Sequence, residues 1–165
     1  MNDRDQKQDS VRRSGDDREP SIRIRNEDLA WLVGSSITEL SYSRKSAWFF
    51  ISGGGLVDTR GCPWRLSDMH ELIACSSDLI HHSLNESSID FIDMVRAAVV
   101  GERITAAMLR DGPPDLLLEI AGHLTLEVLA TSVESDNWES WSPAGVRLLV
   151  TASRRATVLP LPFGS

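Results

Sequence analysis

Hydrophobic and polar residues alternate most clearly between residues 116 and 128. A three-residue turn at 121–123, with Gly122 inside it, separates two apolar segments, and this spacing favours an antiparallel hairpin. A two-residue turn would move Glu127 onto the apolar face, because a one-residue slip exchanges the two faces of a strand. The three-residue turn predicts one face made of three aliphatic pairs: Ile120 with Leu124, Leu118 with Leu126, and Leu116 with Val128.

A second pattern occurs twice along the chain. Residues 32–38 (LVGSSIT) resemble residues 99–105 (VVGERIT) at a separation of 67, and residues 48–57 resemble 116–125 at a separation of 68. In each copy a short apolar segment precedes a glycine, which is typical of a helix that ends at a residue with positive φ. A β-rich stretch then follows, at 36–42 and at 103–109. These matches predict an internal repeat over about 29–66 and 95–141.

The remaining segments complete the predicted fold. Helical spacing indicates helices over 67–84, where Asp68 and Glu71 suit a helix N-terminus, and over 89–99. Strands are expected at 146–152 and 156–159. We expect an α+β fold in which an antiparallel sheet is built from two similar helix–β-hairpin repeats, with additional helices between them. Residues 22–160 form one domain in this interpretation, and residues 1–21 are a disordered polar tail.

Charge narrows the classes of partner. The chain has 165 residues with 17 Lys and Arg against 24 Asp and Glu, a net charge of −7. Residues 1–21 hold five basic and six acidic residues, which leaves 12 and 18, or −6, on the rest. This balance argues against nucleic-acid binding. The absence of a long apolar run argues against a membrane span, and two cysteines make no disulfide scaffold, so we expect a cytoplasmic protein.

Metal and cofactor chemistry lacks its usual motifs. The Cys and His residues do not have zinc-ligand spacing; they are Cys62, Cys75, His70, His81, His82 and His123. Residues 53–55 are three consecutive glycines without a phosphate-loop sequence, and a hairpin loop explains them more simply. No serine or cysteine lies in a nucleophile motif. We therefore expect no metal, no cofactor and no catalytic residues.

One enzymatic alternative uses the polar face of the second hairpin. Glu119 and Glu127 lie diagonally on that face, and His123 lies at the turn. Two carboxylates can act as acid and base when one of them is desolvated. A solvated sheet face is the simpler interpretation, so a small hydrolase ranks below a binding protein.

Tryptophan usage is the most informative feature for function. Trp138 and Trp141 lie in a polar, acidic segment at 133–143. Such aromatic residues either cover the core or anchor a partner, and acidic neighbours attract a basic one. We expect a non-catalytic protein-binding module, for example an immunity-type protein that neutralises a basic toxin. The alternative is a structural role in which the hairpins pair across a homodimer. The expected partner-binding residues are Glu134, Asp136, Trp138, Glu139 and Trp141.

Several of these motifs occur together in a known group of proteins. The Val-Gly-x-x-Ile-Thr pattern, the glycine hairpin and Trp-Glu-Ser-Trp at 138–141 resemble small, often actinobacterial proteins with a domain of unknown function. The sequence departs from that group at 153–155, where Ser-Arg-Arg replaces a glycine-rich turn. The resemblance implies a fold and a bacterial origin, but no activity. The matching positions are Gly122, Leu124, Leu126, Trp138, Glu139, Ser140, Trp141 and Gly145.

Overall fold

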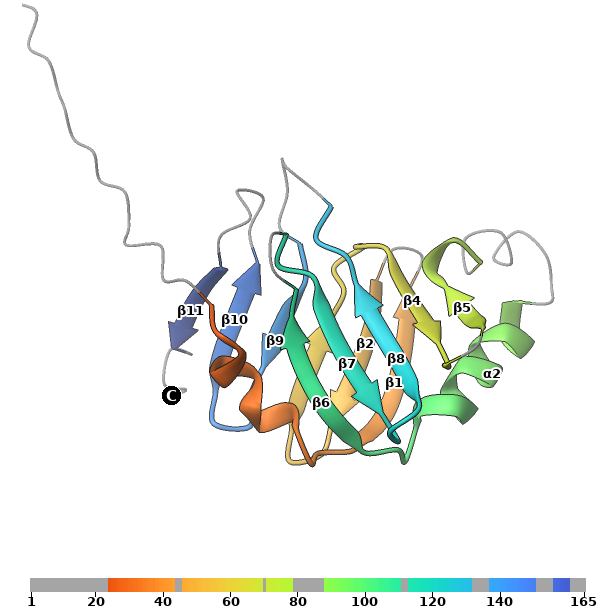
Figure 1. The fold of residues 1–165 in the computed structure, drawn as a ribbon, viewed down its shortest axis with the longest axis horizontal. Coiled ribbons are helices and arrows are strands. Elements are labelled where there is room, and N and C mark those ends of the chain that lie inside the picture. Colours follow the sequence, from red (N-terminus) through yellow and green to blue (C-terminus); the bar gives the residue numbers. More distant parts are fainter. Residues whose placement is uncertain are drawn as a thin grey trace, which may run out of the picture.

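Two antiparallel sheets face each other in the computed structural model (Figure 1). The structure describes residues 24–43, 46–69, 71–78, 88–110, 113–131, 137–150 and 156–160. The six-stranded sheet consists, in spatial order, of β1 (Ile37–Ser43), β2 (Ser46–Ile51), β3 (Gly55–Asp58), β9 (Glu139–Trp141), β10 (Val146–Val150) and β11 (Ala156–Pro160). The five-stranded sheet consists of β5 (Leu72–Cys75), β4 (Trp64–Ser67), β8 (Leu124–Val128), β7 (Leu116–Ile120) and β6 (Ile104–Leu109).

The core lies between the two sheets, where alternate side chains of each strand meet. Phe49 and Trp64 come from opposite sheets and pack edge to face, with ring centres 6.3 Å apart. The largest fully buried side chains also include Leu66, Leu118 and Trp138. Apolar burial of this kind stabilises the fold by roughly 1.5–3 kcal/mol for each large side chain.

A helix covers one edge of each sheet. The 3₁₀ helix η1 (Asn26–Leu32) packs against β6, and Asn26 Oδ1 accepts a hydrogen bond of 2.8 Å from the backbone of Leu109. Helix α2 (Ser88–Val99) packs against β1, and Arg96 Nη2 donates a bond of 3.3 Å to the carbonyl of Leu40. Figure 1 shows α2 at one end of the molecule and β11 at the other.

The two halves of the chain exchange strands. The meander β1–β2–β3 is extended by β9, which comes from the second half of the chain. The meander β6–β7–β8 is extended by β4, which comes from the first half. Each sheet therefore contains strands from both halves, so neither half can complete its own sheet. The sequence predicted one antiparallel sheet built from two similar helix–β-hairpin repeats, whereas the structure has two sheets that each combine strands from both halves.

The starts of β1 and β6 are joined across the two sheets by a short antiparallel contact between Ser36 and Arg103. Gly34 N–H donates to the Ile104 carbonyl and Gly101 N–H to the Ile37 carbonyl, both at 2.8 Å. The two glycines have φ values of 86° and 91°, as expected from the sequence. Positive φ turns both amides toward the opposite half of the chain, which a residue with a Cβ atom rarely does.

The residues after each glycine repeat the same contacts. Ile37 and Ile104 are both fully buried. A bulge follows each of them, at Thr38 in β1 and at Thr105 in β6. The Thr38 hydroxyl donates to the Phe50 carbonyl at 3.2 Å, and the Thr105 hydroxyl donates to the Glu119 carbonyl at 3.3 Å. The shared Gly-x-x-Ile-Thr pattern thus corresponds to a turn, a buried anchor and a bulge.

Other expectations from the sequence can be compared directly with the structure. The register of the second hairpin is confirmed, with Leu116 opposite Val128, Leu118 opposite Leu126 and Ile120 opposite Leu124. The glycine run forms the turn between β2 and β3, and the helix expected at 89–99 is α2. A sheet-rich mixed fold with antiparallel strands is confirmed. The polar tail at 1–21 lies outside the described residues.

The helix expected over 67–84 is wrong for its first half. Residues 72–75 form strand β5, and only residues 76–78 are helical within the described part of that segment. Asp68 Oδ1 accepts a bond of 2.8 Å from Glu71 N–H, and Asp68 N–H donates to the Glu71 carbonyl at 3.0 Å. An Asp side chain makes the first of these bonds at a helix N-terminus as well as in a tight turn, so the two patterns resemble each other in sequence.

Gly101→Ala tests the contact between residues 34–37 and 101–104. No described atom lies within 4 Å of a Cβ placed at Gly101, so the substitution imposes only the cost of positive φ. We expect the free energy of unfolding, measured by urea denaturation, to fall by about 1–2 kcal/mol. Gly101→Asn is the control and should lose less, because Asn tolerates positive φ better. An alanine variant as stable as the wild type would contradict this role.

Candidate interaction site around the glycine turn

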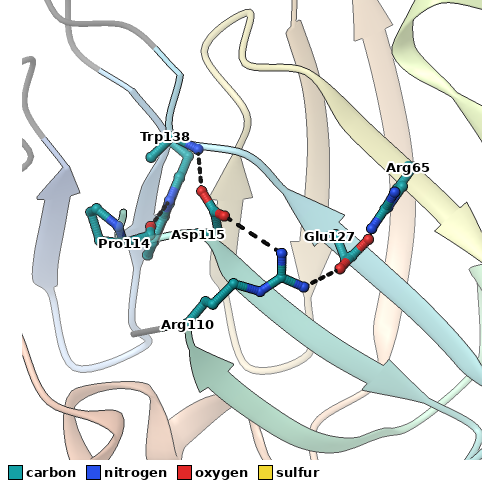
Figure 2. Close-up of polar contacts among 7 residues, drawn as sticks. Arg65, Arg110, Pro114, Asp115, Glu127 and Trp138 are labelled. Carbon is teal, nitrogen blue, oxygen red and sulfur yellow. Dashed lines mark hydrogen bonds and ion pairs between the residues drawn. The ribbon is translucent and has the colours of Figure 1, made fainter. Parts of the chain in front are cut away.

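Trp138 belongs to the core. Its side chain is 0% exposed, and its indole N–H donates a bond of 2.8 Å to the carbonyl of Pro114 (Figure 2). A side chain without exposed surface cannot anchor a partner, so Trp138 covers the core, which was one of the two roles considered for it. Glu134 and Asp136 lie outside the described residues.

Glu139 is also unavailable to a partner. It is buried, and its carboxylate accepts hydrogen bonds from Arg147 Nε at 2.8 Å and Nη2 at 2.5 Å. Arg60 Nη1 lies 3.2 Å from its other oxygen. Two guanidinium groups neutralise this carboxylate, and its burial leaves little surface for the basic partner expected from the sequence.

Trp141 is the one described member of the expected site with accessible side-chain surface. It lies on the outer face of the six-stranded sheet, next to Leu56 on β3, which in turn lies next to Phe50 on β2. Directly opposed residues of antiparallel strands share a face. Trp141 and Leu56 are half-buried and Phe50 is 37% exposed. We call these three residues the apolar row.

Charged residues lie at both ends of the apolar row. Glu39 on β1 is opposite Phe50, and Arg147 on β10 is opposite Trp141. The guanidinium carbon of Arg147 lies 5.0 Å from the centre of the Trp141 ring, a cation–π geometry. Arg147 therefore positions Trp141 as well as neutralising Glu139. Among the described residues, the Trp141 indole N–H is covered and has no hydrogen-bond acceptor.

A shallow cavity of about 450 Å³ lies along the apolar row. It is lined by the row, by neighbouring residues of β1 and by the turn between β2 and β3, which consists of Ser52, Gly53 and Gly54. The outer face of this sheet is thus concave at its apolar part. Binding surfaces are commonly concave and apolar with a few polar groups at the margin.

The glycine turn separates this cavity from a second one. A Cβ atom on Gly55 would lie 2.3 Å from the Trp31 ring, so only glycine allows the indole to lie against the turn. On the far side, Trp31 lines a cavity of about 270 Å³ together with residues of the β9–β10 turn. Three consecutive glycines therefore form a hairpin loop and also provide the surface on which Trp31 packs.

Sequence reasoning missed Trp31, Phe50, Leu56 and Arg147. A signal for Phe50 exists in β2, where Ala47-Trp48-Phe49-Phe50-Ile51 is apolar on both faces of the strand. An antiparallel sheet with one solvated face usually alternates apolar and polar residues. A run without alternation, in a strand that has only one buried face, indicates an apolar outer surface.

The outer face of the five-stranded sheet is different in character. Glu127 is buried there between Arg65, which donates from Nε, and Arg110, whose Nη2 donates at 2.6 Å (Figure 2). Arg110 Nη1 also lies 3.9 Å from Asp115, whose Oδ1 accepts a bond of 2.8 Å from Ala130 N–H. This network joins β4 to β8 and to the segments that flank β7.

The same network argues against the hydrolytic alternative. The pKa of Glu127 is lowered, chiefly by the hydrogen bond from Arg65. The charge of Arg65 and the hydrogen bond and charge of Arg110 lower it further, and together they outweigh the opposing effect of burial. A carboxylate held in its ionised form cannot serve as the general acid. Glu119 is exposed opposite Thr125, and His123 is exposed at the turn. These three residues do not form the acid–base set that was considered.

Cys62, Cys75 and His123, the described cysteines and histidine, do not form a metal site. Burial raises the pKa of the Cys62 thiol to about 11, and its Sγ lies 3.7 Å from Asn137 Oδ1. Cys75 ends β5 rather than lying in a helix, and its Sγ lies 3.1 Å from Asp78 Oδ2. Within the described ranges, no group of three or more His, Cys, Asp and Glu residues could hold a metal ion. His70, His81 and His82 lie outside those ranges.

Comparison with family models, with curated proteins and with solved structures finds no match to this chain. The resemblance to small bacterial proteins therefore remains a prediction from the sequence. No helix in the described part of the chain is both long and apolar enough to span a membrane.

Glu127→Gln tests the arginine network. A neutral amide cannot pair with two guanidinium groups, so we expect the free energy of unfolding at pH 7 to fall by about 2 kcal/mol. Because folding lowers the pKa of Glu127, its contribution is present above the ordinary carboxyl range and is lost as the pH falls through the folded value. The difference between variant and wild type should therefore shrink in acid.

Glu119→Gln is the matched control, since it removes an exposed carboxylate from the same face. We expect it to leave the free energy of unfolding unchanged. Chemical denaturation at several pH values measures both variants. A Glu127→Gln difference that stays constant into acid would contradict the assignment of the network.

Proposed function

We propose that this protein is a non-catalytic binding module whose protein partner docks on the apolar row. The main support for this proposal is that Phe50, Leu56 and Trp141 form a continuous accessible row across three strands, along a concave surface. An apolar centre with a charged margin is the usual anatomy of a protein interface. Tryptophan is also enriched among the residues that contribute most to binding.

The position of the Trp141 ring supports the same surface. Arg147 holds the ring in position before binding, which reduces the entropy lost when the complex forms.

Charge favours a basic partner. The part of the chain that follows residue 21 carries a net charge of −6, and Glu39 lies exposed at one end of the apolar row. Opposite charge accelerates association and makes it sensitive to salt. An immunity-type protein that neutralises a basic toxin is one concrete form of this function.

A structural role as a homodimer is the alternative. The accessible apolar row would suit self-association, but two copies that each carry a net charge of −7 repel each other. Light scattering of the purified protein separates the two functions. A dimer mass that Trp141→Ala converts to a monomer would favour the structural role.

Trp141→Ala tests the proposed surface. A photoreactive residue at Leu56 identifies partners in the host, and the affinity of the purified candidate is then measured with each variant. We expect Trp141→Ala to weaken binding at least 30-fold, about 2 kcal/mol, as for a central interface residue. Met108→Ala is the control, because Met108 is an accessible apolar residue on the other sheet. Equal affinities for the two variants would contradict the proposal.

We also propose that the two halves of the chain are copies of one ancestral unit. The reciprocal bonds of Gly34 and Gly101 and the paired bulges at Thr38 and Thr105 support this origin. A duplicated unit that exchanges strands resembles a swapped dimer joined into one chain.

Separate expression of residues 1–82 and 83–165 tests the strand exchange on which this proposal rests. Each fragment lacks strands of its own sheet, so we expect neither to fold alone. Mixed together, they should regain the circular dichroism spectrum and the cooperative unfolding of the intact chain. A fragment that folds alone would contradict a strand-exchanged pair of units.

A further inference from the structure

The cavity beside Trp31 is the second hollow next to the glycine turn. Its volume is about 270 Å³, slightly below the 300–1,000 Å³ typical of pockets that enclose drug-sized molecules. A single long side chain is therefore a better match than a cofactor. Its lining is apolar except for Ser142 and the carboxylate of Asp28.

Asp28 is partly available to a ligand. Its Oδ2 accepts a bond of 2.9 Å from Arg25 N–H, which holds the side chain in place at the start of η1. Among the described residues, the other oxygen has no partner and no basic side chain lines the cavity. A single carboxylate at an apolar cavity favours a cation that carries its own apolar stem.

We propose that this cavity is a binding socket for a cationic side chain, and specifically for an arginine of the partner protein. The stem packs against Trp31, Val146 and Leu148, while the guanidinium group pairs with Asp28. Arginine is preferred over lysine because its planar head is less strongly hydrated and pairs with a carboxylate through two bonds. This inference rests on the proposed function and adds a basic contact to the apolar row.

The position of the socket suits that combination. Gly55 contacts Trp31 on one side, and it belongs to the cavity along the apolar row on the other. Pro143 lines the socket and is the nearest side chain to Gly53. Val146 and Leu148 lie on the opposite face of the sheet from Trp141, because Leu148 pairs with Ser140 and Arg147 with Trp141. A partner that reaches around the glycine turn would therefore contact Trp141 on one face and place an arginine beside Trp31 on the other.

The chain's own C-terminal segment is the competing occupant. Pro160 on β11 is paired with Val146, which lines the socket, and five residues follow it in the sequence, among them Leu161 and Phe163. Those residues are apolar and would leave Asp28 without a counter-charge. The test below therefore uses the full chain.

Titration with N-acetyl-arginine amide tests the socket without any knowledge of the partner. The five tryptophans give five indole N–H signals in a ¹H–¹⁵N spectrum, and Trp31→Phe identifies one of them. We expect a saturable shift of the Trp31 signal at millimolar probe and a much smaller shift of the Trp141 signal. N-acetyl-citrulline amide has nearly the same shape without charge and should bind at least tenfold more weakly.

Two matched variants separate a specific contact from general acidity. Asp28→Asn keeps an acceptor for Arg25 N–H, and we expect it to weaken the arginine probe at least tenfold. Glu27→Gln removes the same charge from the neighbouring residue, which does not line the socket, and should change the affinity less than threefold. Equal binding of both probes, or an Asp28→Asn variant that binds as the wild type does, would overturn the proposal.

Two further outcomes are decisive. Binding that occurs only after removal of residues 161–165 would mean that the chain's own end fills the socket, and the proposal would be wrong. Arginine binding at Trp31 together with partner affinity that is insensitive to Trp141→Ala would support the socket but contradict the proposed docking surface.

Discussion

The reciprocal hydrogen bonds between residues 34–37 and 101–104 are the constraint on which the rest of the structure depends. At this point each half of the chain passes from its helix into the opposite sheet. If the amides of Gly34 and Gly101 did not face across the contact, β1 and β6 could not begin side by side. Farther along the chain, β4 pairs with β8 and β9 pairs with β3, so each sheet also receives a strand from the other half. Both sheets of the sandwich therefore contain strands from both halves of the chain.

Strand exchange also creates the candidate site. Trp141 is contributed by β9 of the second half, whereas Phe50, Leu56 and Trp31 come from the first half. The two cavities meet at the turn between β2 and β3, because Gly55 admits the Trp31 ring at a distance that excludes a Cβ atom. Arg147 then fixes Trp141 and neutralises Glu139 in a single arrangement. The contacts of Gly55 with Trp31 and of Arg147 with Trp141 therefore belong both to the fold and to the candidate site.

Much of the local structure could be predicted. The register of the β7–β8 hairpin followed from alternation alone, because a shift by one residue would bury Glu127 among aliphatic side chains. The helix predicted to start near Asp68 failed because Asp and Glu three residues apart serve a tight turn equally well. The site was predicted only in part. Trp138 and Trp141 lie in similar polar sequence, yet one is fully buried and the other reaches the outer face.

By itself, the sequence determined the elements whose signals are local: the glycines at positive φ, the hairpin turns, the α2 helix and the acidic balance of the chain. The tertiary structure alone decided which strands become neighbours, and hence which side chains share a surface. Pairing of β3 with β9 joins residues more than 80 positions apart, as with Leu56 and Trp141. No periodicity within a short window carries that information, because cross-strand contacts depend on the path of the whole chain through both sheets.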